Sequence, residues 1–231
     1  MNVMETKDIA NVNVDALFER ISALIEESRK EVATAVNIAE VYTKYEIGRY
    51  IVENEQEGKA RAAQTLIKPD DAIILASGST VTAFAEALSP VGMVNVVTPS
   101  LGIATLMNRR NNVKVFVLGG ALYNNSFSVR GEYAEAGLKN VSCSKLYIGC
   151  DGIDLASGIT CATIEEARLT NAMMSAASQT VVLADSSKFG RRGFGKIGML
   201  EDIDIIITDS GIPDTLREKI EDAGVQIIIA D

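Results

Sequence analysis

Four small polar residues, Ser77-Gly78-Ser79-Thr80, separate an apolar run from a segment with helical spacing. A strand, a small loop and a helix in this order suit an anion, because backbone N–H groups converge at the start of a helix and hydroxyls add donors. Phosphate is the anion that this arrangement favours. The alternative is that Ser79 or Thr80 merely caps a helix that begins near Val81.

Small and polar residues also follow four other segments that are expected to be strands. In an open parallel sheet, ligands bind beyond the carboxyl ends of the strands, so these residues are expected to meet. They are Thr98-Pro99-Ser100, Gly119-Gly120, Asp151-Gly152-Ile153-Asp154 and Asp185-Ser186-Ser187-Lys188. Together they offer hydroxyls and amides for a phosphate, the carboxylates of Asp151 and Asp154 for sugar hydroxyls, and the charge of Lys188. The pattern indicates a phosphorylated sugar or polyol, and the alternative for the two aspartates is an Asx-type turn.

The composition restricts the chemistry. The chain of 231 residues contains no histidine, so any proton transfer would need carboxylates, Lys, Tyr or Cys. Its cysteines, Cys143, Cys150 and Cys161, form no Cys-x-x-Cys pair, which argues against a disulfide framework and a thiolate zinc site. We therefore expect neither a metal nor a cofactor.

Charge and hydropathy restrict the partners and the location. A net charge of −9 argues against a broad basic face for nucleic acid. No run approaches the roughly 18 apolar residues of a membrane span, and the N-terminus lacks a secretory pattern. A cytoplasmic protein that does not enter the membrane is expected.

The elements that would hold these residues follow from the pattern after Asp71, where short β-rich runs alternate with helical stretches. Strands are expected at residues 72–76, 94–98, 114–118, 145–150, 180–184, 203–208 and 226–230, and helices at 81–88, 101–108, 133–140, 164–177 and 213–223. This alternation predicts an α/β fold with a largely parallel sheet and helices on both faces.

A helical, charge-rich segment precedes the α/β pattern. Apolar residues at helical spacing predict an amphipathic helix from Asn13, and a second apolar series either continues it or follows a turn at Asn37. A third, short helix is expected at residues 59–67. We place a boundary between a helical N-terminal segment, 1–58, used for packing or oligomerisation, and a domain at 59–231.

Several motifs occur in a characteristic order: Ser77-Gly78-Ser79-Thr80, Leu118-Gly119-Gly120, Gly149-Cys150-Asp151-Gly152-Ile153-Asp154, Gly158-Ile159-Thr160, Glu165-Glu166-Ala167 and the run from Leu183 to Gly190. With them, residues from about 59 to 231 resemble the C-terminal effector-binding domain of DeoR-family transcriptional regulators. The resemblance implies a Rossmann-like sheet related to those of ribose-5-phosphate isomerase and the coenzyme A transferases, used as a sensor of phosphorylated sugars.

The resemblance also implies a set of ligand residues. They are Gly78, Ser79, Thr80, Gly119, Gly120, Asp151, Gly152, Asp154 and Lys188, to which the polar strand ends add Ser77, Thr98 and Ser100. Two residues depart from the family pattern: Ala76 stands where the family commonly has Asp, and Pro99 where it has Asn.

The N-terminal segment shows a different resemblance. Ala35-Val36-Asn37 and Tyr45-Glu46-Ile47-Gly48-Arg49 are similar to the helical N-terminal domain of YhcG-like nucleases, without a nuclease core. No winged helix-turn-helix is recognisable, so DNA is an expected partner only if this segment supplies a module. Because its charges are mixed, a packing or oligomerisation element is favoured over a DNA contact.

Three functions fit these observations. The favoured one is a non-enzymatic, homo-oligomeric sensor of a phosphorylated sugar or polyol that belongs to a repressor. The second is a sugar-phosphate isomerase in which Asp151, Asp154, Glu166 and Lys188 would manage protons and charge. The third is an assembly protein with a degenerate pocket. Outside the isomerase hypothesis, Glu165 and Glu166 are interpreted as surface residues that favour the start of a helix.

Overall fold

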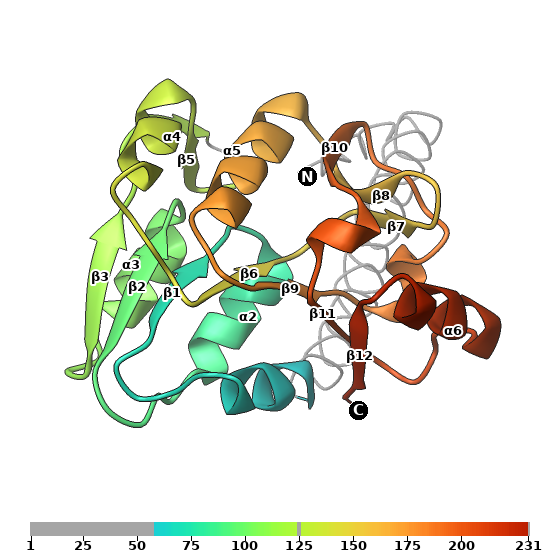
Figure 1. The fold of residues 1–231 in the computed structure, drawn as a ribbon. Helices are drawn as coiled ribbons and strands as arrows, with labels where there is room; N and C mark the ends of the chain where they lie inside the picture. Colours follow the sequence, from blue (N-terminus) through green and yellow to red (C-terminus); the bar gives the residue numbers. More distant parts are fainter. Residues whose placement is uncertain (1–57, 124–125, 231) are drawn as a thin grey trace, which may run out of the picture. The chain divides into compact units, whose positions relative to one another are not determined.

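The apolar runs that alternate with helices come together in one parallel sheet (Figure 1). The computed structural model of the chain describes residues 58–123 and 126–230. The sheet contains β1 (Ala72–Leu75), β2 (Val94–Thr98), β3 (Val113–Val117), β6 (Lys145–Ile148), β9 (Thr180–Leu183), β11 (Ile205–Thr208) and β12 (Gln226–Ile229). All adjacent strands are parallel, in the order β12-β11-β9-β6-β1-β2-β3. The predicted fold class is confirmed.

The strand order reverses direction at the centre of the sheet. From β1 the chain proceeds outward through β2 to β3, and then returns to the other side of β1 with β6. β1 is hydrogen-bonded to both β2 and β6. Their carboxyl ends therefore flank a topological switch point, which is where open α/β sheets bind ligands.

Helices cover the two faces of the sheet. They are α2 (Ser79–Ala87), α3 (Leu101–Met107), α4 (Glu132–Leu138), α5 (Ile164–Ser175), α6 (Asp214–Asp222) and a helical stretch at residues 58–65. Side chains alternate along each strand, so Ile73 and Leu75 pack with residues 58–65, α2 and α3, whereas Ile74 packs with α4, α5 and α6.

The helix at residues 58–65 is held against the sheet by apolar packing and by polar contacts. Ala60 and Ala63 are buried in the same cluster as Phe84 and Tyr147, whose ring centroids lie 4.7 Å apart. The hydroxyl of Tyr147 donates to the carbonyl oxygen of Ala63 at 3.2 Å. Tyr147 is thus buried with its polar atom satisfied, as buried tyrosines generally are.

Two lysines are almost completely buried, and each pairs with an aspartate. Lys145 Nζ lies 3.1 Å from Asp71 Oδ2, at the amino ends of β1 and β6. Lys59 Nζ lies 3.2 Å from Asp209 Oδ2, just after the carboxyl end of β11. Pairing is required because an isolated buried ammonium would be strongly destabilising.

The sequence did not predict two smaller antiparallel sheets. One is the hairpin of β4 (Ala121–Tyr123) and β5 (Ser128–Arg130), and the other joins β7 (Gly152–Asp154), β8 (Gly158–Cys161) and β10 (Gly195–Gly198). Two 3₁₀ helices, η1 (Ser186–Lys188) and η2 (Leu200–Asp202), follow β9 and β10. The smaller sheets lie in the connections of the large sheet, where they shape its carboxyl edge.

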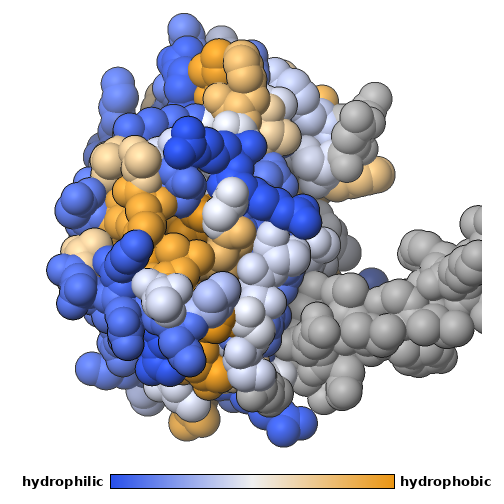
Figure 2. Space-filling view, turned by 90° about the vertical axis from the view of Figure 1, so that its right-hand side faces the viewer, coloured by the Kyte–Doolittle hydropathy of each residue, from blue (hydrophilic) through white to orange (hydrophobic). Residues whose placement is uncertain are grey.

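Figure 2 looks onto the side of the molecule where α6 lies in Figure 1, and apolar residues gather there among hydrophilic ones. On α6, at its C-cap and on β12, the half-buried apolar side chains that pack against the core are Leu216, Ala223, Ile228 and Ile229.

The third predicted helix is confirmed, since residues 58–65 are helical. The two predicted helices before it lie outside the described residues, and the boundary between residues 58 and 59 stays a prediction. Within the described ranges, no helix has both the length and the apolar character needed to cross a membrane.

Candidate functional site

The loop after β1 presents an uncapped helix start. α2 begins at Ser79, and its N-cap is Gly78, which makes no side-chain hydrogen bond. Gly78 has a φ of 123°, a conformation that glycine adopts far more readily than other residues. The alternative in which Ser79 or Thr80 caps this helix is therefore wrong. The first N–H groups of α2 remain available to an external acceptor.

The hydroxyls around this helix start are also available. Among the described residues, no partner is hydrogen-bonded to the side chains of Ser77, Ser79 or Thr80. Thr82, one turn later, instead donates its hydroxyl to the carbonyl oxygen of Gly78 at 2.8 Å. Three hydroxyls and the N–H groups of one helical turn thus converge here, without partners in the described part of the chain.

A cavity of about 120 Å³ lies at this loop, between the carboxyl ends of β1 and β6. It is lined by Ser77, Gly78, Ser79, Thr80, Gly149, Cys150, Asp151, Cys161, Glu166 and Lys188. Half of the predicted ligand residues surround it, namely Ser77, Gly78, Ser79, Thr80, Asp151 and Lys188. The structure brings these residues together, and ligand binding by them stays a prediction.

Lys188 supplies the positive charge of the cavity. It is the last residue of η1, which Asp185 caps by accepting a hydrogen bond from the N–H of Ser187 at 2.9 Å. Lys188 is half-buried and pairs with no carboxylate in the described ranges. An unpaired, half-buried ammonium beside a helix start favours an anionic ligand.

The two cysteines of the cavity are neutral thiols. Burial raises the pKa of Cys150 to about 12, although the charge of Lys188 opposes this shift. Burial likewise raises the pKa of Cys161 to about 11. Since a nucleophilic or metal-binding cysteine must be a thiolate, these side chains form an apolar part of the wall.

Glu166 is a functional candidate that the favoured interpretation missed. It lies in the first turn of α5 and lines the cavity, with Oε2 placed 3.2 Å from Nη2 of Arg130. Arg130 also donates to the hydroxyl of Thr163, the N-cap of α5, at 2.9 Å. Burial raises the pKa of Glu166, and Arg130 opposes this. The signal in the sequence was the motif Glu165-Glu166-Ala167.

Thr98 and Ser100 lie away from the cavity and organise the turn after β2. Thr98 is completely buried, and its hydroxyl oxygen accepts a hydrogen bond from the N–H of Ser100 at 3.1 Å. Ser100 caps α3 by accepting from the N–H of Ile103 at 3.3 Å. Both hydroxyls therefore have structural partners.

Gly119, Gly120 and Gly152 do not line the cavity either. Gly120 has a φ of 141°, and a Cβ there would lie 2.7 Å from the carbonyl oxygen of Arg130. A Cβ on Gly152 would lie 2.3 Å from the carbonyl oxygen of Arg191. At Gly120 and Gly152 a close backbone approach requires glycine, independently of any ligand.

Asp154 does not line the cavity and forms an Asx-type turn, which was the alternative to a role in ligand binding. Its Oδ1 accepts from the N–H groups of Ala156 at 3.0 Å and Ser157 at 2.8 Å, and it pairs with Arg192 Nη2 at 3.0 Å. These are the contacts of an Asx-type turn. The two carboxylates at the cavity are consequently those of Asp151 and Glu166.

The two departures from the family pattern are both buried. Ala76 is buried in the apolar cluster that contains Leu118 and Ile148. Pro99 is buried, and its carbonyl oxygen accepts from the N–H of Val129 at 2.9 Å. Neither side chain is among those that line the cavity.

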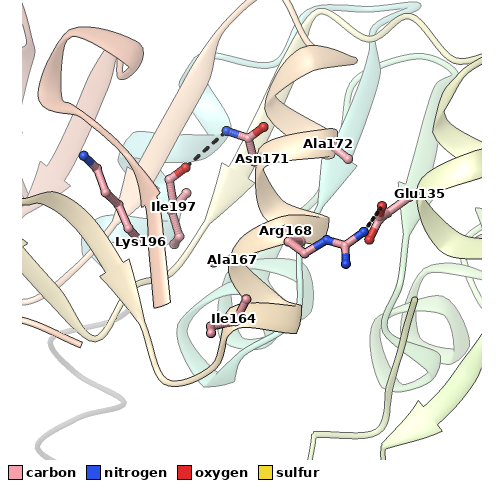
Figure 3. Close-up of a pocket in the computed structure, with 8 residues that line it drawn as sticks. All are labelled: Glu135, Ile164, Ala167, Arg168, Asn171, Ala172, Lys196 and Ile197. Carbon is pink, nitrogen blue, oxygen red and sulfur yellow. Dashed lines mark hydrogen bonds and ion pairs between the residues drawn. The ribbon is translucent and has the colours of Figure 1, made fainter. Parts of the chain in front are cut away.

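A larger, more open cavity of about 400 Å³ lies beside α5 and β10 (Figure 3). The residues that line it are Glu135, Ile164, Ala167, Arg168, Asn171, Ala172, Lys196 and Ile197. Arg168 pairs with Glu135 at 3.2 Å, and the side-chain amide of Asn171 donates to the carbonyl oxygen of Ile197 at 3.2 Å. These polar groups satisfy one another, so the smaller cavity is the better candidate.

A parallel α/β sheet with an open helix start and, within the described ranges, an unpaired lysine at its switch point is typical of ligand-binding α/β domains. Residues 52–210 match the family described as the DeoR C terminal sensor domain. The chain belongs to the DeoR family of transcriptional regulators.

Relatives in this family are regulators. The transcriptional regulator GlpR of Haloferax volcanii is 31% identical over 84% of this chain and 76% of that protein. GolR of Listeria innocua is 29% identical over 100% of this chain and 92% of its own length. A protein of Escherichia coli O157:H7 that is named as an aga operon transcriptional repressor is 36% identical over 74% of this chain. The alignment spans 63% of that repressor, less than two thirds of its length.

Solved structures support the fold. eIF2B beta from Chaetomium thermophilum is similar over 77% of this chain and 56% of that chain, with a TM-score of 0.51 and 16% identity. Ribose 5-phosphate isomerase A from Methanocaldococcus jannaschii has a TM-score of 0.43 and 17% identity, over 59% of this chain and 54% of its own. At 16% identity the likeness to eIF2B beta concerns the fold alone. The resemblance of the N-terminal segment to YhcG-like nucleases stays unconfirmed.

Proposed function

We propose that the effector of this DeoR-type sensor domain is a phosphorylated sugar or polyol that occupies the cavity between β1 and β6. The observation that carries the proposal is the start of α2. There, N–H groups and the hydroxyls of Ser77, Ser79 and Thr80 lie around one cavity with Lys188, and none of these side chains has a partner among the described residues.

Each side of the cavity has a distinct role in this proposal. The first turn of α2 and the three hydroxyls donate to the phosphate oxygens, and Lys188 balances their charge. Asp151 and Glu166 accept hydrogen bonds from the hydroxyls of the polyol. The neutral thiols of Cys150 and Cys161 face the apolar edge of the carbon chain.

Binding requires no catalytic step, and we propose a sensor without enzymatic activity. The relatives described above are named as transcriptional regulators, which supports this function. Incubation of the full chain with ribose 5-phosphate, followed by a ketose assay, tests it directly. Turnover would contradict a pure sensor.

We propose that DNA, if it is bound, is contacted through the N-terminal segment, and that the chain is a homo-oligomer. The alignment with GolR supports the first part, because it extends over the whole of this chain. Gel retardation with genomic fragments at low salt tests DNA binding. Light scattering coupled to size-exclusion chromatography tests the oligomeric state.

Thermal unfolding of the full chain against a panel of sugar phosphates, polyol phosphates and inorganic phosphate tests the effector class. A ligand at 100 times its Kd stabilises the folded state by about 2.7 kcal/mol. For a domain of this size, this corresponds to a rise in Tm of roughly 5 to 10 °C. If no panel member raises Tm, the proposed effector class is wrong.

A further inference from the structure

Asp209 connects the cavity to the helix at residues 58–65. Its Oδ2 accepts a hydrogen bond from the N–H of Ser186 at 2.9 Å and lies 3.2 Å from Lys59 Nζ. Its Oδ1 accepts from the N–H of Gly211 at 3.0 Å. One carboxylate oxygen is therefore shared by the helix that follows the N-terminal segment and by the first residue of η1.

The Ser186 end of this connection leads directly into the cavity. Ser186 begins η1, a single 3₁₀ turn whose last residue is the cavity lysine, Lys188. The N–H of Lys188 donates to the carbonyl oxygen of Asp185 at 3.1 Å, which keeps the turn rigid. A displacement of Lys188 toward a bound phosphate would therefore move the N–H of Ser186 against Asp209.

The Lys59 end is buried and has little freedom to adapt. Lys59 is 2% exposed, whereas the side chain of Asp209 is 17% exposed. Burial raises the pKa of Asp209, but the hydrogen bonds from Ser186 and Lys59 outweigh this effect and hold the pKa at about 2. Asp209 is thus ionised at neutral pH, and separating its carboxylate from the buried ammonium of Lys59 would be costly.

A second contact joins the same helix to the other side of the cavity. Tyr147 donates to the carbonyl oxygen of Ala63, and its strand, β6, runs into Gly149 and Cys150 on the cavity wall. Residues 58–65 are therefore linked to the loop after β6 as well as to η1. They also follow immediately on the N-terminal 57 residues of the chain.

From these contacts we infer that Lys59 and Asp209 are positioning residues, which place Lys188 at the cavity and couple its occupancy to the helix at residues 58–65. The inference rests on the proposed function, since it requires an anionic effector in the cavity. Because coupling between two sites is reciprocal, loosening the ion pair must change effector affinity, and effector binding must change the stability of the helix.

The test compares two matched variants of the full chain. Lys59→Met breaks the pair at the cavity end of the sheet, and Lys145→Met breaks the equally buried pair with Asp71 at the opposite end. Calorimetric titration with inorganic phosphate and with the best sugar phosphate of the panel gives the affinities. Amide hydrogen exchange of residues 58–65, with and without that sugar phosphate, gives the response of the helix.

We expect Lys59→Met to weaken binding about tenfold, a typical coupling between sites, and Lys145→Met to change it less than twofold. Bound sugar phosphate should slow exchange in residues 58–65 of the wild type and of Lys145→Met, but not of Lys59→Met. Lys59→Arg, which preserves the charge, should restore both effects. The inference is overturned if the two Met variants behave alike, or if exchange in the helix is insensitive to the ligand.

If Lys59→Met is too unstable to measure, a second variant can still test the coupling. The double variant Lys59→Met with Asp209→Asn removes both charges and avoids a lone buried carboxylate, so it offers a second, better-packed test of the same prediction. If the wild type binds no member of the panel, the proposed function fails together with this inference. If the wild type binds and only the coupling is absent, this inference alone fails.

Discussion

Replacing Lys188 by Met should weaken effector binding strongly while leaving the fold unchanged. The substitution keeps most of the length of the side chain and removes its charge. Lys188 is half-buried on η1 and has no ion-pair partner within the described ranges, so no buried carboxylate is left unpaired. Its removal therefore acts on the ligand and not on an internal contact.

The expected rise in Kd follows from the position of the Lys188 ammonium at the cavity. A hydrogen bond to a charged group contributes about 1.5 to 3 kcal/mol, which corresponds to a rise in Kd of roughly 10- to 150-fold. An independent estimate from Coulomb's law, for unit charges about 4 Å apart, gives about 1 kcal/mol in water and about 4 kcal/mol near a protein surface. A half-buried site lies between these limits, so the two estimates agree.

Isothermal titration at a fixed ionic strength provides the assay, and Lys196→Met provides the control. Lys196 is an exposed lysine of β10 that lines the larger cavity, and its loss changes the net charge by the same amount. We expect the control to bind within twofold of the wild type. A Kd for Lys188→Met that is also within twofold of the wild type, or an equal loss in both variants, would refute the assignment of the phosphate site.

Three further predictions concern neighbouring groups. Glu166→Gln should weaken binding of a sugar phosphate about tenfold more than binding of inorganic phosphate, because it replaces a charged acceptor for hydroxyls by a neutral one, whereas the loss of the ion pair with Arg130 affects both ligands; paired titrations with both ligands check this. Because the pKa of Asp209 falls from 3.8 to about 2 on folding, its carboxylate stabilises the fold above about pH 4, and this contribution is lost as the pH falls toward 2. The free energy of unfolding, measured with urea between pH 4 and pH 2, should depend less steeply on pH in Asp209→Asn than in the wild type. An equally steep dependence in both proteins would count against the ion pair. Tyr147→Phe should lower the free energy of unfolding by about 1 to 3 kcal/mol, since the carbonyl oxygen of Ala63 loses its donor; chemical denaturation measures this, and no loss would contradict the role of that contact.

The large sheet could be predicted from the sequence because its strands are continuous apolar runs. Segments such as Ile73 to Leu75 and Ile205 to Ile207 are buried on both faces of the sheet. Every residue in them is therefore apolar, and the uninterrupted apolar run predicts a buried strand. The start of α2 lies two residues earlier than expected, because the positive φ of Gly78 allows the backbone to turn into the helix there.

The small sheets could not be predicted, because their strands have only three or four residues and because one of their pairings, β8 with β10, joins distant parts of the chain. β8 pairs with β10, where Cys161 lies opposite Gly195. Strands of this kind are rich in glycine and lack the alternating pattern that marks a half-buried strand. Their existence is decided by contacts between distant parts of the chain.

The sequence predicted which loops meet at the candidate site, because this follows from the order of the strands. It did not predict in which direction individual side chains in those loops point. The rule for carboxyl strand ends brought together the loop after β1, Asp151 and Lys188. Whether Asp154 faces a ligand or its own backbone depends on the N–H groups of Ala156 and Ser157, which the sequence left open. The position of Glu166 on a helix was expected, but its direction toward the cavity depends on how α5 packs.

The contact of Gly152 with the backbone of Arg191 affects how a saturation mutagenesis screen of this protein should be interpreted. Any side chain at Gly152 would overlap the carbonyl group of Arg191, so regulation would be lost without a single contact to the effector being removed. Loss of function on substitution of Gly152 would therefore indicate only that its backbone must lie close to that of Arg191. Under the proposed function, positions such as Ser79 and Lys188, whose side chains line the cavity and have no partner in the part of the chain that the structure describes, would report on the effector itself.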